Sequence, residues 1–272
     1  LQPLLCIKNV GERFISGLLE LGVESMKIRN ICSIQGTAME NEDALGNIEN
    51  YFWIIDGATD LYDSKKSIGY SVSEITHLLS EKLKVYCNEK ESLKTIFQNA
   101  IKEVRNIIGL NDSNHEEYYK LPTFAFIIAR LSQRKLEYLI LGDCVMLVND
   151  EQLTDHRVDR LFDLGKNEIE NSKKGLNVLN KKEILQKIRG LANTEKGYWI
   201  GSLDDSSIEH ALYGNLEVTG DKIVLMSDGF YDYYSQNITK SFEELIVMRK
   251  QSTELDPIYG KKDDASILVV EL

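Results

Sequence analysis

The stretch FWIIDGATD, residues 52–60, decides the fold prediction because it joins a buried strand to a carboxylate. Residues 52–55 are all apolar, which is typical of a strand that is covered on both faces. The run then ends on Asp56-Gly57 instead of a neutral turn. Asp-Gly after a strand is most often a turn, so the other strand ends have to decide whether Asp56 is a turn residue or a ligand.

The same pattern recurs at other apolar runs. Asp143 follows the run 139–141, Asp228 follows 223–226, and Asp263 precedes the run 265–270. In an antiparallel sheet the end of one strand and the start of its neighbour lie on the same rim, so these acids can converge on one edge. Each acid alone is more typical of a turn or a solvated loop. The interpretation depends on the set and its shared placement.

A second acidic segment, Glu42-Asp43, precedes Asp56 by one predicted hairpin. A turn centred between Glu49 and Asn50 places Asp43 opposite Asp56. Two carboxylates that face each other are unfavourable unless a cation lies between them, although the segment could also be the polar flank of a hairpin. Clustered oxygen ligands suit Mg²⁺ or Mn²⁺ and not zinc.

The remaining pattern predicts an α+β protein. Runs rich in β-branched or aromatic residues predict strands over 26–34, 43–47, 51–56, 123–131, 136–142, 145–149, 222–227 and 265–271. Apolar residues at helical spacing predict long helices over 68–83 and 93–108 and shorter ones over 184–191 and 242–246. Tight turns between neighbouring strands favour antiparallel sheets, with the long helices covering one sheet face of a two-sheet core.

The chain of 272 residues shows no Pro/Gly/Ser linker, which predicts one domain over 26–272. We expect residues 1–25 to be an N-terminal extension. Residues 150–200 are rich in Lys, Asn, Asp and Glu, so we expect a flap-like surface excursion and not a core element.

Charge and composition exclude several classes of protein. The net charge of −11 and the lack of a basic stripe argue against binding nucleic acid. No apolar run is long enough to cross a membrane. Four scattered cysteines without a CxxC pair argue against a disulfide framework or a zinc site and favour the cytoplasm. The four histidines, His77, His115, His156 and His210, are interpreted as surface or packing residues.

The order of the acidic motifs resembles that of the metal-dependent protein serine/threonine phosphatases of type 2C (the PPM family), in particular the bacterial members. The motifs are ENEDA (40–44), DGAT (56–59), LGDC (141–144), SDGFYD (227–232) and KDDASILVV (262–270). The resemblance spans residues 26–272 and implies a two-sheet antiparallel β-sandwich flanked by helix pairs, in four α-β-β-α layers.

The resemblance also implies a set of metal ligands for two or three Mg²⁺ or Mn²⁺ ions. Asp56 would bridge two ions and the Gly57 carbonyl would bind one of them. Glu42 and Asp43 would support that ion. Asp228 and Asp263 would complete the shell of the other ion, and Asp143 with Asp228 would match a third site. The catalytic residues would then be Asp56, Asp228 and Asp263.

Two positions depart from the family pattern. Ala38 stands where many members have an Arg that binds the substrate phosphate, and Ala58 stands where many have a His that is a proposed proton donor. Arg157, Arg160 and Arg189, in the excursion, are candidates to replace the missing cation.

Three further positions are weighed in the same way. Thr123 and Ser266 match small polar positions of the family but are interpreted as buried strand residues, and Trp199 is interpreted as an anchor of the excursion.

The leading hypothesis is a cytoplasmic, monomeric, Mg²⁺- or Mn²⁺-dependent phosphatase. It would hydrolyse phosphoserine and phosphothreonine in proteins by metal-activated hydroxide, without a phosphoenzyme, and would oppose a serine/threonine kinase. No cysteine lies in a phosphate-binding loop and no Ser-His pair is indicated by spacing, so the residues offer no covalent nucleophile. Two alternatives remain: a non-catalytic regulatory module with the same fold, and a two-metal phosphatase that acts on small metabolites.

Overall fold

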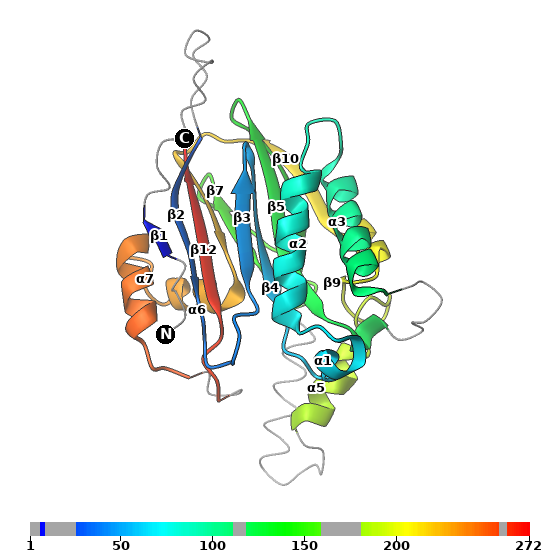
Figure 1. Cartoon of the computed structure of the whole chain (residues 1–272). Coiled ribbons are helices and arrows are strands. Elements are labelled where there is room, and N and C mark those ends of the chain that lie inside the picture. Colours follow the sequence, from blue (N-terminus) through cyan, green and yellow to red (C-terminus); the bar gives the residue numbers. More distant parts are fainter. Residues whose placement is uncertain (1–5, 9–25, 111–117, 159–180, 256–259) are drawn as a thin grey trace.

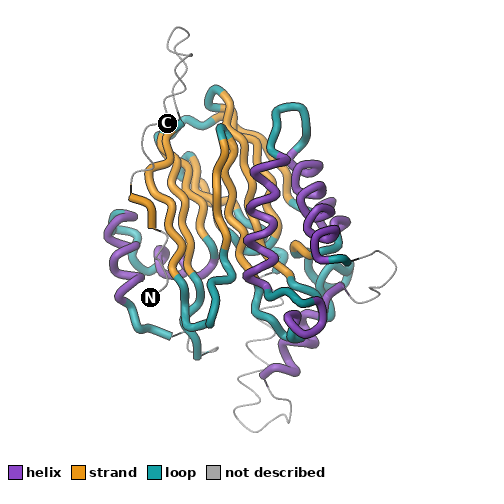
Figure 2. Tube along the Cα trace, in the orientation of Figure 1, coloured by secondary structure: helices purple, strands orange, loops and turns teal. Residues whose placement is uncertain are grey.

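The computed structural model describes residues 6–8, 26–110, 118–158, 181–255 and 260–272. Two antiparallel sheets stack against each other, and a helix pair covers the outer face of each sheet (Figure 1). Figure 2 shows the strands in the middle with helices on both sides. The four-layer α-β-β-α arrangement confirms the predicted fold class.

The two sheets differ in how their strands are ordered. One sheet has the spatial order β1 (Cys6–Lys8), β2 (Lys27–Ile34), β12 (Ala265–Glu271), β11 (Lys222–Met226), β7 (Val145–Val148) and β8 (Glu151–Leu153). The other has the order β10 (Leu212–Glu217), β6 (Lys135–Leu141), β5 (Thr123–Ser132), β4 (Tyr51–Gly57) and β3 (Ala44–Ile48), with β9 (Gly201–Ser202) paired to β5. All eight predicted strands are present, and each end lies within one residue of its prediction.

The helices follow the apolar pattern of the sequence. Those that cover the sheets are α2 (Val72–Tyr86), α3 (Leu93–Ile108), α6 (Asp228–Ser235) and α7 (Phe242–Gln251). The others are α1 (Ser64–Ile68), α5 (Lys181–Arg189) and the 3₁₀ turns η2 (Tyr118–Lys120) and η3 (Asp205–His210). Helix α2 begins at a capping box in which Ser71 and Glu74 satisfy each other's backbone N–H groups.

Strand β4 is buried on both faces, as predicted. Phe52 and Ile54 pack between the two sheets. Tyr51, Trp53 and Ile55 point the other way and pack beneath α2 and α3. Because side chains alternate along a strand, an unbroken apolar run is the pattern that a strand between two packed layers requires.

The predicted hairpin register is confirmed. Ala44 lies opposite Ile55 and Ile48 lies opposite Tyr51, so the turn is centred between Glu49 and Asn50. Continuing this register by one residue brings Asp43 to the level of Asp56 at the end of the hairpin.

The described part of residues 150–200 contains a packed region that the sequence did not indicate. Within the described part of this segment, Val158, Ala192, Tyr198 and Ile200 form a small apolar cluster of their own, against which Ile188 packs. The segment is therefore packed in part and not only a solvated excursion. The sequence did not reveal this cluster, because its apolar residues are too few and too spread out to form a periodic pattern. The ring of Trp199 stacks on that of His210 with centroids 3.3 Å apart, which confirms both as packing residues.

Other elements were missed for physical reasons. The edge strand β10 has polar or exposed residues and no apolar alternation, and the helix α6, which begins at Asp228-Gly229, was not predicted. The cysteine prediction also needs correction: β1 sets Cys6 opposite Cys32, and Cys32 is disulfide-bonded, whereas Cys87 and Cys144 are free thiols. Among the described residues, no helix is both long and apolar enough for a membrane span.

Candidate metal centre

The predicted acids gather at one end of the sandwich. Asp56 lies at the end of β4, Asp143 in the β6–β7 connection, Asp228 at the start of α6, two residues after the end of β11, and Asp263 just before β12. All four line one cavity of about 630 Å³. Since β4 and β6 belong to one sheet and β11 and β12 to the other, the cavity opens between the two sheets. The convergence expected from strand ends is therefore present.

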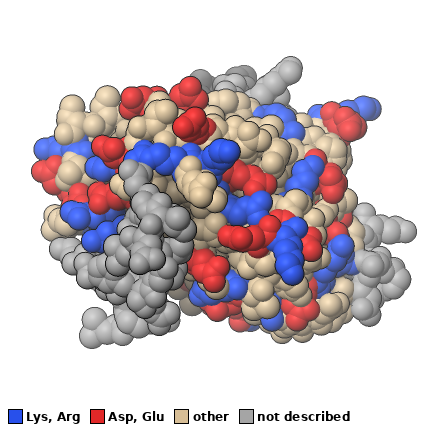
Figure 3. All heavy atoms as spheres, turned by 90° about the horizontal axis from the view of Figure 1, so that it is seen from above, with Lys and Arg blue, Asp and Glu red and all other residues tan. Residues whose placement is uncertain are grey.

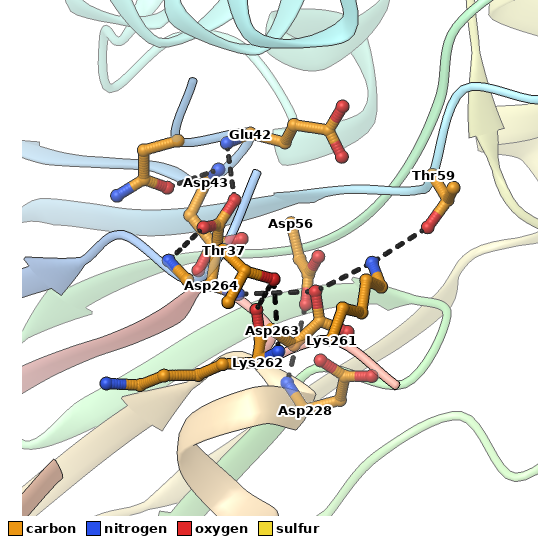
Figure 4. Close-up of polar contacts among 12 residues, drawn as sticks. Thr37, Glu42, Asp43, Asp56, Thr59, Asp228, Lys261, Lys262, Asp263 and Asp264 are labelled. Atoms are coloured by element: carbon orange, nitrogen blue, oxygen red, sulfur yellow. Dashed lines mark hydrogen bonds and ion pairs between the residues drawn. The ribbon is translucent and has the colours of Figure 1, made fainter. Parts of the chain in front are cut away.

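Figure 4 shows how these side chains face one another. The carboxylates of Asp56 and Asp228 point into the same space, with Asp263 and Lys261 beside them. The backbone N–H of Asp228 donates to Asp56 Oδ2 over 3.4 Å. This long hydrogen bond joins the end of β4 to the start of α6 and links the two sheets at the site.

The electrostatics of the site are strongly unfavourable for so many ionised groups. Burial, and then the charges of Asp43, Asp228 and Asp143, raise the pKa of Asp56 well above its usual value. Burial, and then the charges of Asp143 and Asp263, do the same to the pKa of Asp228. A bound cation would reverse this effect, because it stabilises the ionised carboxylates that burial and repulsion destabilise.

Glu42 and Asp43 lie beside the site, just before β3, but neither of them lines the cavity. Burial raises the pKa of Glu42 to about 8, and the nearby Lys261 lowers it only in part. Burial also raises the pKa of Asp43 to about 7, although hydrogen bonds with Ser266 and Ser227 lower this pKa in part. Asp43 is 2% exposed, and its Oδ2 has no hydrogen-bond partner. A buried carboxylate oxygen without a donor is costly, and it fits a site that binds a cation directly or through water.

Two glycines allow the backbone to close around the acids. A Cβ on Gly57 would lie 2.6 Å from the Glu42 carbonyl oxygen, and one on Gly229 would lie 2.1 Å from the Asp264 carbonyl oxygen. Both contacts are impossible for a real Cβ, so the Gly that follows each Asp is required for packing. This close approach explains why both strand ends read Asp-Gly.

The sequence analysis missed the role of Asp264. This residue is 7% exposed and accepts hydrogen bonds from the backbone N–H groups of Gly36 and Glu42, both at 2.7 Å. Asp264 therefore holds the segment that carries Glu42 and Asp43. The only signal in the sequence was a second Asp beside Asp263, which looks the same as a solvated loop.

The candidate replacements for the missing Arg have different surroundings. Arg157 donates to Asp155 through Nε at 2.7 Å and Nη2 at 2.6 Å, so it is a structural ion pair at the start of the excursion. Arg160 lies outside the described residues. Arg189 lines the cavity but is 9% exposed, and it lies 3.5 Å from the Thr59 carbonyl oxygen.

The small polar positions and the histidines stand mostly as interpreted. Thr123 and Ser266 are fully buried strand residues. His115 lies outside the described residues. His156, which was interpreted as surface or packing, is exposed but lines the cavity.

Within the described part of the chain, no group of three or more His, Cys, Asp or Glu side chains is arranged so that it could hold a metal ion as it stands. The carboxylates instead surround a shared space. Mg²⁺ keeps several of its waters and takes one or two carboxylates in sites of this kind, so an open ring of acids fits it better than a tight cage would. The oxygen-only donor set also suits Mn²⁺.

The comparisons with known proteins agree with this geometry. The family model for protein phosphatase 2C matches residues 35–256, so the chain belongs to the protein phosphatase 2C family. No curated protein matches the sequence. The solved structures that resemble the chain are about as long as it is, and all those described below are 15% identical to it or less.

One of these structures is the PPM Ser-Thr phosphatase MsPP from Mycobacterium smegmatis in complex with cacodylate, which is 14% identical, with 92% of this chain and 99% of that chain covered and a TM-score of 0.53. Another is the Staphylococcus aureus phosphatase Stp1, which is 15% identical, with 92% and 96% covered and a TM-score of 0.53. The catalytic domain of the serine threonine protein phosphatase PstP in complex with 2 manganese ions is 13% identical, with 90% and 97% covered and a TM-score of 0.54. At this identity the likeness shows the fold.

Proposed function

We propose that this protein is a Mg²⁺- or Mn²⁺-dependent phosphatase that hydrolyses phosphoserine and phosphothreonine in proteins, opposing a kinase. The observation that carries the proposal is the convergence of Asp56, Asp143, Asp228 and Asp263 on one cavity. Membership of the protein phosphatase 2C family supports phosphate monoesters as the substrate class. The manganese ions in the PstP structure support a divalent metal.

Each acid of the site would have a different place around the bound cations. Asp56 lies among acids from both sheets and would be shared between cations, with the Gly57 carbonyl beside it. Asp228 and Asp263 would hold one side of the site and Asp143 a further position, while Glu42 and Asp43 would support it from within. When bound, divalent cations lower the pKa of a water molecule and offset charge on the phosphoryl oxygens.

A mechanism without a covalent phosphoenzyme fits the cysteines of the structure. Burial, and then the charges of Asp56 and Asp143, raise the pKa of the Cys144 thiol well above its usual value. Burial raises the pKa of Cys87 to about 12. A thiol must be ionised to attack phosphorus, so neither free thiol is an activated nucleophile.

The test is hydrolysis of p-nitrophenyl phosphate and of a phosphothreonine peptide in the presence of Mn²⁺. We expect turnover by the parent and its loss in Asp56→Asn and Asp228→Asn. Asp221→Asn is the matched control, because Asp221 is an exposed acid at the opposite end of β11 from Asp228. No turnover by the parent, or equal turnover in the two site variants and the control, contradicts the proposal.

A non-catalytic regulator is the second candidate, and Ala38 and Ala58 favour it because neither can bind phosphate or transfer a proton. Calorimetry separates the two functions. Mn²⁺ uptake without hydrolysis of any phosphomonoester supports the regulator, whereas Mn²⁺ uptake with hydrolysis supports the enzyme. A panel of small phosphorylated metabolites beside the phosphopeptide identifies the preferred substrate class.

A further inference from the structure

Four Lys and Arg side chains line the cavity among the described residues: Arg189, Arg249, Lys261 and Lys262. A phosphate dianion that enters an acidic cavity needs a cation that faces the acids and keeps donors available. The surroundings of the four side chains decide which of them meets that requirement.

Three of the four side chains donate to backbone carbonyl oxygens and not to carboxylates. Arg249 is 7% exposed, donates to the Asp263 carbonyl oxygen at 3.0 Å and lies over the Tyr233 ring. Lys262 Nζ donates to the carbonyl oxygens of Arg249 and Ser252 at 2.8 and 3.0 Å, so it fastens the end of α7. Arg189 is 9% exposed and lies beside backbone of the 56–59 loop.

Lys261 is the cation that contacts a carboxylate of the site, that of Asp263. Its Nζ lies 3.1 Å from Asp263 Oδ1 and 3.0 Å from Thr59 Oγ1. Figure 4 shows the ammonium between these two residues, on the side of the site where Asp56 and Asp228 also lie. The side chain is 29% exposed, which leaves it accessible from the cavity.

The pair formed by Lys261 and Thr59 has unused hydrogen-bonding capacity. An ammonium has three donors, and Lys261 uses two of them, on Thr59 Oγ1 and Asp263 Oδ1. The Thr59 hydroxyl accepts from Lys261, so its own hydrogen remains available to another acceptor. An incoming phosphate oxygen can therefore receive hydrogen bonds from both residues at once, from segments 202 residues apart in the chain.

We propose that Lys261 and Thr59 together bind the phosphate group of the substrate. The proposal rests on the proposed function for the identity of the substrate, and on the contacts above for the residues. Lys261 supplies the charge and Thr59 a directed hydrogen bond. In the absence of substrate, Lys261 pairs with Asp263 and offsets part of the negative charge of the site.

The experiment measures the dissociation constant of inorganic phosphate by calorimetry on the Mn²⁺-loaded protein, for the parent, Lys261→Met, Lys261→Arg, Thr59→Val and Lys262→Met. Loss of a charge-assisted hydrogen bond is expected to weaken phosphate binding about 10- to 100-fold in Lys261→Met, and loss of a neutral one about 5-fold in Thr59→Val. Lys261→Arg keeps the charge and is expected to retain most of the affinity. Lys262→Met is the matched control, one residue away, with no expected change.

A second titration, of Mn²⁺ into the metal-free proteins, separates phosphate binding from a merely structural role. We expect Lys261→Met to bind Mn²⁺ at least as tightly as the parent, because the competing ammonium is gone from Asp263. Phosphate binding in Lys261→Met equal to that in Lys262→Met overturns the proposal. The proposal is also overturned if Lys261→Met loses affinity for phosphate and for Mn²⁺ to the same extent, because that result indicates a structural role.

The outcome also distinguishes this proposal from the hydrolase itself. If the parent binds phosphate and hydrolyses no phosphomonoester, the proposed enzyme fails while the phosphate titrations still decide on Lys261. If the Mn²⁺-loaded parent binds no phosphate at all, the assignment of Lys261 and Thr59 is overturned.

Discussion

The two ends of strand β4 differ in how their charged side chains are paired. At its start, Tyr51 accepts a hydrogen bond from Arg130 Nη1 at 2.9 Å, and the same guanidinium donates from Nε to Glu137 at 2.9 Å. At its end, Asp56 lies among acids, and Lys261 contacts one of them, Asp263. One end is neutralised by the chain and the other is not.

The unbalanced charge at the end of β4 indicates that this end, and not the start of the strand, is suited to bind a ligand. The hairpin at the start of β4 belongs to the end of the molecule that carries the C-terminus (Figure 1). Seen from that end, Lys and Arg alternate with Asp and Glu over the surface (Figure 3). Ion pairs within a protein stabilise its fold, whereas several unpaired acids in one cavity destabilise it. Such a cavity is typical of a binding site, where function is favoured over stability.

The largest expected effect is at the unbalanced end. Asp56→Asn removes a carboxylate that would be shared between cations, so phosphatase activity should fall at least about a thousand-fold. The same substitution should raise the melting temperature of the metal-free protein, because it removes repulsion and keeps the shape of the side chain. Activity assays and thermal melts in EDTA measure the two effects. A melting temperature that falls together with activity would make Asp56 a structural residue and break the comparison.

The opposite result is expected at the balanced end. Arg130→Met leaves Glu137 and the Tyr51 hydroxyl without their donor, which should lower the free energy of unfolding by about 2 to 3 kcal/mol. The variant should retain the activity and Mn²⁺ affinity of the parent, since Arg130 lies at the far end of the strand. Urea denaturation and calorimetry test this, and a loss of Mn²⁺ binding would show that the two ends are coupled.

The pH dependence of stability should carry the signature of the acidic end. The folded pKa values of Glu42 and Asp43 are raised to about 8 and about 7, against ordinary values of 4.5 and 3.8. Between the ordinary and the raised values, the folded chain therefore binds more protons than the unfolded chain. This stabilisation is complete at low pH and is lost as pH rises through the folded values.

The melting temperature of the metal-free protein should therefore fall by several degrees between pH 5 and pH 8. Mn²⁺ should remove or reverse the trend, because the ion needs ionised carboxylates. Carboxyls with lowered pKa values, such as that of Glu74, titrate below this window and do not mask the effect. An unchanged melting temperature across the window in EDTA argues that these acids are ordinary solvated groups.

The smallest effect belongs to the middle of β4, where no charge is involved. Trp53 Nε1 donates to Ser80 Oγ at 2.9 Å, and Ser80→Ala should lower the free energy of unfolding by about 1 kcal/mol. The loss should be the same at pH 5 and pH 8 and with or without Mn²⁺. Denaturation curves under the four conditions provide the baseline against which the two ends are compared.

Most of the fold could be predicted from the sequence because the strands are packed between layers. Unbroken apolar runs such as 52–55, and the hairpin register that follows from them, leave little choice of pairing. The convergence of the acids could be predicted for the same reason, since strand ends share a rim. Edge strand β10, with polar residues on an exposed edge, has no such pattern and was missed.

The finer features of the site could not be predicted because they depend on contacts between distant loops. Asp264 and Lys261 lie beside Asp263 in sequence, yet one holds backbone N–H groups and the other faces Thr59. Nothing in the spacing separates these roles. The small apolar core of the excursion, which includes Tyr198 and Ile200, depends in the same way on packing that only the structure shows.

We expect the acidic end of β4 to be complete only when divalent cations are bound. Titration of Mn²⁺ into the metal-free protein at pH 8, followed by calorimetry, is the decisive measurement. We expect uptake of about two ions per chain in the parent and in Asp221→Asn, with release of protons, and a marked loss in Asp56→Asn. Uptake that is absent in the parent, or equal in Asp56→Asn and Asp221→Asn, would contradict this expectation.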